Sequence, residues 1–160
     1  MGSLDWRDTD STRCSVARTA AVVGDGWTVL LLRDLFNGLR RFDELAAHLG
    51  VARNVLTRRL AALTEAGVIT RVPYREPGAR ARHEYRLTDA GRDLLPVLLA
   101  MAAWGDRHRA GAAGPPVLVE HAGCGATVHV ELRCGAGHLL EPRADRLRSV
   151  PGPGAARRAG

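Results

Sequence analysis

Aromatic residues and lysine are the scarcest components of this 160-residue chain: 4% of the residues are aromatic and none is lysine. With so few rings available, a core would have to be built mainly from Leu, Val and Ala. All 23 basic residues are therefore Arg, and the formal net charge is +6. An excess of guanidinium groups favours polyanionic partners, because Arg stays charged and pairs with phosphate through two hydrogen bonds. Complete use of Arg also follows from a GC-rich genome, so the placement of the charges has to decide their role.

Cysteine is sparse as well, with only three residues, Cys14, Cys124 and Cys134. So few and scattered thiols exclude a secreted disulfide scaffold. Residues 1–13 are polar and lack the apolar segment of a signal peptide. The longest apolar runs, 29–32 and 94–103, are too short to cross a membrane. These absences predict a cytoplasmic protein.

Catalytic motifs are absent too. The chain has no Gly-x-Ser-x-Gly elbow, no glycine-rich phosphate loop and no His-Glu-x-x-His zinc motif. Its six histidines are not spaced with carboxylates in a catalytic pattern. We therefore expect a binding protein and not an enzyme.

Apolar periodicity and turn residues predict four helices in the first half of the chain. A short Ala/Val-rich helix over 15–23 precedes a buried helix over 27–36, which Asn37-Gly38 ends. The apolar stripe of 42–49 then stops at Gly50, and a further helix over 53–65 ends at Ala66-Gly67. Two helices joined by a short turn that contains Gly are typical of a helix-turn-helix.

The pattern changes to strand character after Gly67. Residues 68–72 and 84–87 suit two strands, joined by a Pro/Gly/Arg loop over 74–83. Thr88 is a suitable N-cap for one long helix that runs to about Arg109, with Pro96 kinking it. The predicted fold class is mainly α with a small β-hairpin wing (α+β), a winged helix-turn-helix.

The exposed face of the 53–65 helix carries side chains that suit a DNA major groove. Arg can read guanine, Asn can read adenine, and small residues let the backbone approach. The candidate DNA-contacting residues of this helix are Arg53, Asn54, Thr57 and Arg58. The alternative is an ordinary solvated helix face.

The predicted wing adds the candidate DNA contacts Arg75, Arg80 and Arg82. Like charges crowded on a hairpin repel each other, and a phosphate backbone or minor groove would relieve that repulsion. The alternative is a solubilising loop. A further alternative for the whole chain is a winged-helix sensor or protein-interaction module that has lost DNA binding, although such a module would have no reason to keep these arginines.

The long helix predicted after Thr88 has apolar residues around most of its circumference, from Leu94 to Trp104. One domain can cover only part of such a surface, which favours a homodimer. Coverage by the C-terminal segment of the same chain is the alternative. A two-fold dimer would need DNA half-sites about 34–36 Å apart, one helical turn.

The predicted organisation is a DNA-binding and dimerisation domain over 13–110, a linker over 111–116, a β-hairpin extension over 117–148 and a disordered tail over 149–160. Within the extension, two pairs of zinc-type ligands are separated by a hairpin length: His121 and Cys124, then Cys134 and His138. The spacing leaves open a zinc ribbon or a metal-free hairpin.

The chain resembles the HxlR family of winged-helix regulators, relatives of the MarR group. The resemblance covers residues 14 to about 109 and rests on Gly26-Trp27-Thr28, Leu30-Leu31-Leu32-Arg33-Asp34-Leu35, Arg41-Phe42-Asp43-Glu44-Leu45, Leu56-Thr57-Arg58-Arg59-Leu60, Ala66-Gly67-Val68-Ile69, Glu84-Tyr85-Arg86-Leu87-Thr88 with Gly91, Leu95-Pro96-Val97-Leu98 and Trp104-Gly105-Asp106. The tail is similar to an extension that many actinobacterial members carry. One departure is Ala52, where members often place a capping Ser.

This resemblance implies a dimeric transcriptional regulator, a repressor by preference, that binds double-stranded DNA at an imperfect inverted repeat. It also implies a response to a small molecule or to a redox signal, because some members sense electrophiles or oxidants through an N-terminal cysteine. Cys14 matches that position, and the neighbouring Arg13 and Arg18 would favour its reactive thiolate. An inert, half-buried cysteine is the alternative.

Overall fold

The computed structural model describes residues 10, 12, 14–75, 81–141 and 143–154. The chain divides into two compact units, residues 22–129 and a second made of 1–21 with 130–160. Helix α1 (Ser15–Val23) has no buried residue. Among the described helices, none is long and apolar enough to cross a membrane by itself, although α1 and α2 taken as a pair pass that test by length and composition.

Helix α2 (Gly26–Phe36) is the central helix of the 22–129 unit, as the near-continuous apolar run predicts. Asp25 caps it, because its carboxylate accepts hydrogen bonds from the N–H groups of Trp27 at 3.1 Å and Thr28 at 3.2 Å. Asp34, also in α2, is only 1% exposed. Its carboxylate is satisfied by Arg33 at 2.7 Å and by Nδ1 of His48, on helix α3, at 2.7 Å. This buried acid therefore joins α2 to α3.

Helices α3 (Phe42–Leu49) and α4 (Arg53–Glu65) form the predicted helix-turn-helix. Gly50 ends α3 in the left-handed conformation, with φ at +63°, which glycine adopts without a steric penalty. Ala52 occupies the N-cap of α4 and contributes no side-chain hydrogen bond. Both bounds of α4 agree with the sequence prediction.

Strands β1 (Ile69–Tyr74) and β2 (Arg82–Leu87) form an antiparallel hairpin. The register pairs Ile69 with Leu87 at one end and Tyr74 with Arg82 at the other. Both strands extend farther than the sequence pattern predicts, so the predicted loop over 74–83 was too long. Tyr74, Arg82 and His83 belong to the strands, because cross-strand hydrogen bonding continues through these polar residues.

The single long helix predicted after Thr88 is wrong, because the chain forms two helices there. Helix α5 (Asp89–Arg92) ends in a turn at 93–94, and α6 (Leu95–His108) begins with Pro96 in its first turn. Proline is favoured at that position because its missing N–H has no helical partner there. Thr88 caps α5 as predicted, accepting a hydrogen bond from the Gly91 N–H at 3.1 Å.

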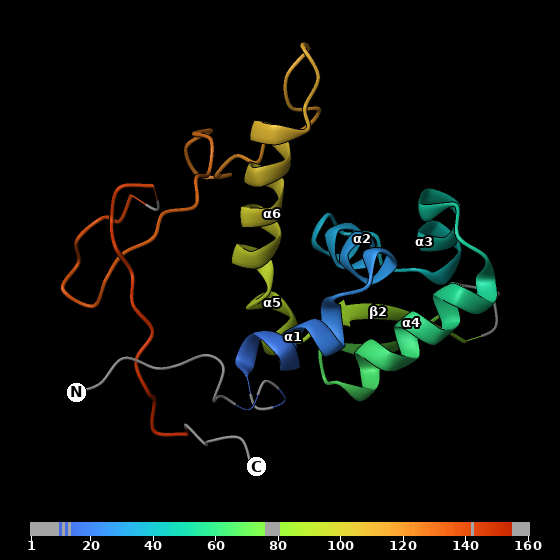
Figure 1. Ribbon diagram of the computed structural model, residues 1–160. Helices are drawn as coiled ribbons and strands as arrows, with labels where there is room; N and C mark the ends of the chain where they lie inside the picture. The colour runs from blue at the N-terminus through green and yellow to red at the C-terminus, as the bar shows by residue number, and fades with distance from the viewer. Residues whose placement is uncertain (1–9, 11, 13, 76–80, 142, 155–160) are drawn as a thin grey trace. The chain divides into compact units, whose positions relative to one another are not determined.

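The core of the 22–129 unit is aliphatic, as the shortage of aromatic residues requires. Its buried members come from α2, α3, α4, the first residue of β1 and the residue before it: Leu31, Leu32, Leu35, Leu45, Leu56, Leu60, Leu63, Val68 and Ile69. Helix α6 contributes only the partly buried Leu98, and Leu94 joins it from the preceding turn. Figure 1 shows α6 standing apart from α3 and α4 after leaving the hairpin through α5. The fold is a winged helix-turn-helix, as predicted.

The C-terminal extension forms tight turns closed by isolated bridges. One bridge joins Glu120 to Thr127 in the 22–129 unit, and another joins Arg133 to Leu139 in the second unit. Nδ1 of His121 lies 3.3 Å from Sγ of Cys124. Within the described ranges, no group of three or more His, Cys, Asp or Glu side chains is placed to hold a metal ion. The two predicted ligand pairs lie in different units, so the choice between a zinc ribbon and a metal-free hairpin stays a prediction.

Candidate nucleic-acid interface

Helix α4 is fixed in the domain by apolar packing on one side and by ion pairs of Arg53 and Arg59. Leu56, Leu60 and Leu63 are each 1% exposed, so this face points into the core. Arg59 reaches the start of α2, where its Nη2 lies 2.8 Å from Oδ2 of Asp25. The same carboxylate that caps α2 therefore also holds α4. This packing leaves the opposite face of α4 open to solvent.

All four residues proposed for DNA contact on α4 lie on that open face. Arg53, Asn54, Thr57 and Arg58 are exposed. The Thr57 hydroxyl donates to the backbone carbonyl of Arg53 at 2.8 Å, and the side-chain Oδ1 of Asn54 accepts from the backbone N–H of Val55 at 2.9 Å. Arg58 makes no hydrogen bond or ion pair with any residue that the structure describes. Its guanidinium can therefore reach a ligand without breaking a contact with the described residues.

Arg53 is held at the start of α4 by two contacts with α3. Its Nη1 lies 2.9 Å from Oδ1 of Asp43, and its guanidinium carbon lies 4.5 Å from the centre of the Phe42 ring. Stacking on a ring and pairing with a carboxylate both limit the freedom of a long side chain. This geometry orients Arg53 in a pocket that it lines together with residues of the hairpin.

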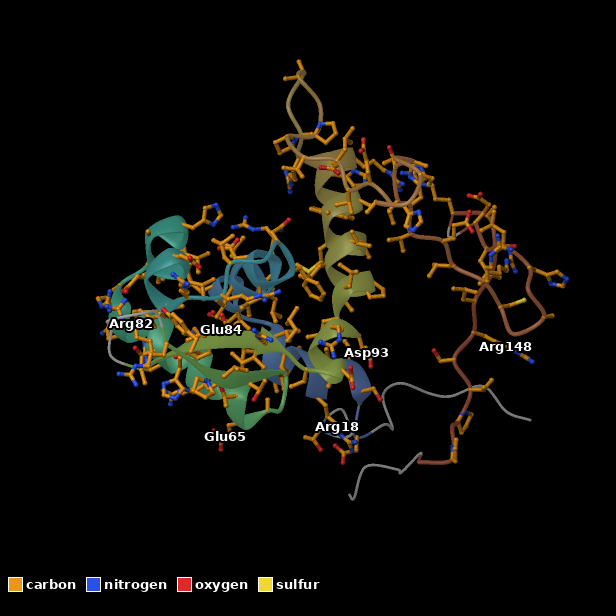
Figure 2. All side chains as sticks on the ribbon, turned by 180° about the vertical axis from the view of Figure 1, so that it is seen from behind. Arg18, Glu65, Arg82, Glu84, Asp93 and Arg148 are labelled. Atoms are coloured by element: carbon orange, nitrogen blue, oxygen red, sulfur yellow. The ribbon has the colours of Figure 1, made fainter. Side chains whose placement is uncertain are left out.

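Two of the predicted wing residues lie at the outer end of the hairpin. Arg82 is the first residue of β2 and is exposed, and Arg75 directly follows β1. Figure 2 shows Arg82 at the outer end of the hairpin and Asp93 beyond its opposite end. Arg80, the remaining predicted contact, lies outside the described residues.

A cleft of about 440 Å³ lies between this hairpin and the first turns of α3 and α4. Four arginines line it, together with His83: Arg41, Arg53, Arg71 and Arg82. The two acidic residues in its wall are already engaged, because Asp43 pairs with Arg53 and the Glu44 carboxylate accepts from the backbone N–H of Arg41 at 3.1 Å. The cleft is therefore a concave surface of net positive charge, which suits a phosphodiester backbone.

Sequence analysis missed Arg41 and Arg71 as members of this cleft. Arg41 stacks on Tyr74, with its guanidinium carbon 4.7 Å from the ring centre. Arg71 donates to Nδ1 of His83 across the hairpin at 3.3 Å. Arg41 immediately precedes α3, and this position beside the start of a helix was the feature of the sequence that could have identified it as a cleft residue. The cross-strand register that brings Arg71 to His83 could not be read from the sequence.

Cys14, the predicted redox residue, lies immediately before α1. It is half-buried and not in a disulfide. Its carbonyl oxygen accepts a hydrogen bond from the backbone N–H of Arg18 at 3.0 Å, which belongs to the helix. Arg13, invoked as a neighbour of the thiol, lies outside the described residues.

Comparison with known proteins gives the same picture of the 22–112 region. The model of the HxlR-like helix-turn-helix family matches residues 22–112. The HTH-type transcriptional regulator Rv3095 of Mycobacterium tuberculosis is 43% identical over 141 residues, which is 88% of this chain and 87% of that protein. YdeP of Bacillus subtilis, also named an HTH-type transcriptional regulator, is 34% identical over 66% of this chain and 82% of that protein.

Solved structures of similar proteins share the fold. The transcription factor PA1607 superposes with a TM-score of 0.75 at 38% identity, over 86% of this chain and 95% of that one. The redox regulator HypR, in its reduced form, superposes with a TM-score of 0.55 at 31% identity, over 60% of this chain and 94% of HypR. The matched family model spans more than half of the sequence, and the similar proteins are named as regulators of transcription. The chain belongs to the HxlR-like helix-turn-helix family of DNA-binding transcriptional regulators, which are winged-helix proteins of the MarR-like type.

Proposed function

We propose that this protein is a homodimeric repressor of the cytoplasm that binds an inverted repeat in double-stranded DNA, each copy placing α4 in a major groove. The observation that carries the proposal is the arginine-lined cleft between α4 and the hairpin. With α4 in the major groove, the phosphates that border the groove would lie next to the hairpin, where Arg71 and Arg82 lie. In this arrangement Asn54, Thr57 and Arg58 read base edges, while Arg53, Arg75, Arg80 and Arg82 fix the position of the backbone.

Salt dependence of DNA binding tests this proposal. Each phosphate neutralised by an arginine releases counterions, so about six contacts would give a slope near −5 in a plot of log affinity against log salt. Fluorescence anisotropy with a random-sequence duplex measures that slope without knowledge of the operator. A slope near zero would contradict the proposal and favour a winged-helix sensor or protein-interaction module that has lost DNA binding. We expect no enzymatic activity, since the chain carries none of the catalytic motifs sought.

The dimer is proposed from the surface of α6. None of its residues is buried, and several large apolar side chains are exposed: Leu95, Val97, Met101 and Trp104, the last at 56%. Residues 97, 101 and 104 follow helical spacing and share one face. A second copy of the chain would cover that face, and a two-fold pair would set the spacing of the two recognition helices.

Substitution of Met101 by aspartate is expected to convert the dimer to a monomer, because it places an unpaired charge in an apolar contact. Analytical ultracentrifugation across a range of protein concentrations measures the change. The matched control is Asp106→Lys, an exposed charge change about 140° around α6 from Met101 by helical geometry. A wild-type chain that sediments as a monomer at every concentration would refute the dimer and leave the C-terminal segment as the cover for α6.

The signal to which the repressor responds is proposed to be a small molecule or a change in redox state. HypR, a structural relative at 31% identity, is named a redox regulator, and Cys14 is unpaired and only half-buried here. A thiol oxidant acting through Cys14 would lose its effect on DNA binding in a Cys14→Ser variant. A small-molecule signal that does not involve Cys14 would change DNA binding equally in the wild type and in the Cys14→Ser variant.

A further inference from the structure

A second cavity lies on the 22–129 unit, where the end of α2, strand β2, the end of α5 and the beginning of α6 come together. Its volume is about 520 Å³. Small-molecule sites commonly occupy about 300–1,000 Å³, so this space can hold a compact organic ligand. Of the residues that line the arginine cleft described above, only Tyr85 also lines this cavity. The two sites are therefore separate.

Half of the residues that line this cavity are aliphatic or phenylalanine side chains. Leu35 and Phe36 contribute from the end of α2, Leu87 from β2, and Leu95 from the first turn of α6. Leu35 is 6% exposed, whereas Leu95 is 39% exposed. An apolar body in this space would remove the exposed part of Leu95 from water and would stabilise the complex through that burial.

The charged part of the cavity wall consists of three arginines and no acid: Arg40, Arg86 and Arg92. Two of them have partners, because Arg86 pairs with Glu84 at 2.5 Å and Arg92 pairs with Asp89 and donates to the carbonyl of Leu87. The guanidinium of Arg40 forms no hydrogen bond or ion pair with the described part of the chain. It is thus available to bind a carboxylate through two parallel hydrogen bonds.

We propose that this cavity binds a small amphipathic anion, a carboxylate attached to an apolar ring or short chain, with Arg40 as its principal anchor. The ligand's apolar part would contact Phe36, Leu87 and Leu95. Both hydrogen-bond donors and apolar surface are needed for such a ligand, and this cavity combines them in one place.

The position of the cavity also connects it with DNA binding, a step that rests on the function proposed above. Arg86 and Leu87 belong to β2, whose other end carries Arg82 into the DNA-facing cleft. Leu95 begins α6, which carries the exposed apolar face. A ligand held against both elements can bind one arrangement of hairpin and α6 better than another, and only such a difference in affinity can shift DNA binding.

Isothermal titration calorimetry of the full chain with 1-naphthoate tests the binding site in the absence of DNA. The neutral probe 1-naphthamide has a similar ring and shape but no charge. We expect saturable binding of naphthoate with one ligand per chain, and binding of naphthamide weaker by about tenfold or more. Equal affinity for the two probes, or no saturable binding of naphthoate at millimolar concentration, would overturn the proposal.

Two variants locate the site. Arg40→Gln is expected to weaken naphthoate binding by about tenfold and to leave naphthamide binding unchanged, because only the charged probe uses the guanidinium. Arg86→Gln should weaken it by a smaller factor, since Arg86 already has a carboxylate partner. The matched control is Arg107→Gln, an exposed arginine of α6 outside the cavity. Naphthoate binding that Arg107→Gln reduces as much as Arg40→Gln would show adsorption to positive charge and would overturn the assignment.

The regulatory step is tested separately, by measuring the effect of naphthoate on DNA affinity in the wild type and in Arg40→Gln. We expect a change in the wild type that the variant lacks. Unchanged DNA affinity at saturating naphthoate would overturn the regulatory step. A chain that binds no DNA at all would refute the proposed function, whereas the calorimetric result would still decide whether the cavity binds the anion.

Discussion

Replacing Gly91 with alanine is expected to destabilise the 22–129 unit by about 3 kcal/mol, because the residue has no room for a side chain. A Cβ atom at this position would lie 2.2 Å from the carbonyl oxygen of Val68 and 3.0 Å from a methyl carbon of Leu87. That carbonyl oxygen also accepts hydrogen bonds from the N–H and the hydroxyl of Thr88, both at 3.0 Å. Moving it aside would disturb the junction between the hairpin and α5.

Thermal unfolding followed by circular dichroism measures this effect, and a loss of more than about 10 °C in Tm is expected. Gly105→Ala is the matched control. A Cβ atom at Gly105, inside α6, meets nothing within 4 Å, and alanine favours a helix interior by roughly 0.5–1 kcal/mol over glycine. If Gly91→Ala unfolds at the wild-type temperature, α5 is not seated on Val68 as the structure shows.

Arg58→Ala is expected to weaken binding to the operator by about tenfold to a hundredfold and to relax the preference at one base pair. The side chain is exposed and has no partner among the described residues, so its loss leaves the fold intact. Selection of binding sites from a random DNA library identifies the operator for the wild type and the variant. Titrations of both proteins with the selected duplex then measure the loss.

Arg82→Ala provides the comparison for this experiment. At the edge of the cleft it should contact phosphate, so its removal should weaken binding to all sequences to a similar extent. Arg107→Ala, on α6, removes the same charge away from α4 and should change neither affinity nor base preference. An Arg58→Ala variant that selects the wild-type sequence with wild-type affinity would show that α4 does not read bases through this residue.

The boundaries of α4 were predictable because strong local signals coincide there. Gly50 ends the preceding helix, Ala66-Gly67 follows the last turn, and Leu56, Leu60 and Leu63 mark the buried side. The exposure of Arg58 follows from the same periodicity. Where turn residues and apolar spacing agree, as they do around α4, the sequence was sufficient to predict the helix and its exposed face, which is one side of the candidate site.

The break between α5 and α6 was missed because apolar residues continue across it. Leu94 and Leu95 fit the pattern of one uninterrupted helix, and only the preference of Pro96 for a first helical turn indicates that a new one begins. The ends of the strands were missed for a different reason. Pairing of Tyr74 with Arg82 depends on the partner strand, and local composition does not contain that information.

Asp34 shows where composition misleads most. It is a charged residue within the apolar 27–36 segment, yet it is buried and contacts His48, fourteen residues farther along the chain. The arginine-lined cleft likewise depends on contacts between distant parts of the sequence, because Arg41 and Arg71 line it together only when the hairpin packs against α3. Such sites require tertiary structure.

Asp25 has a consequence for how this domain tolerates change. Its Oδ1 receives the first N–H groups of α2 and its Oδ2 holds Arg59 of α4. Two helices distant in sequence thus share one anchoring group, so their stabilities are not independent quantities. A substitution of Asp25 would therefore weaken the anchoring of α2 and of α4 at once. The losses in unfolding free energy measured for separate substitutions of Asp25 and Arg59 would not add up to the loss in the double variant.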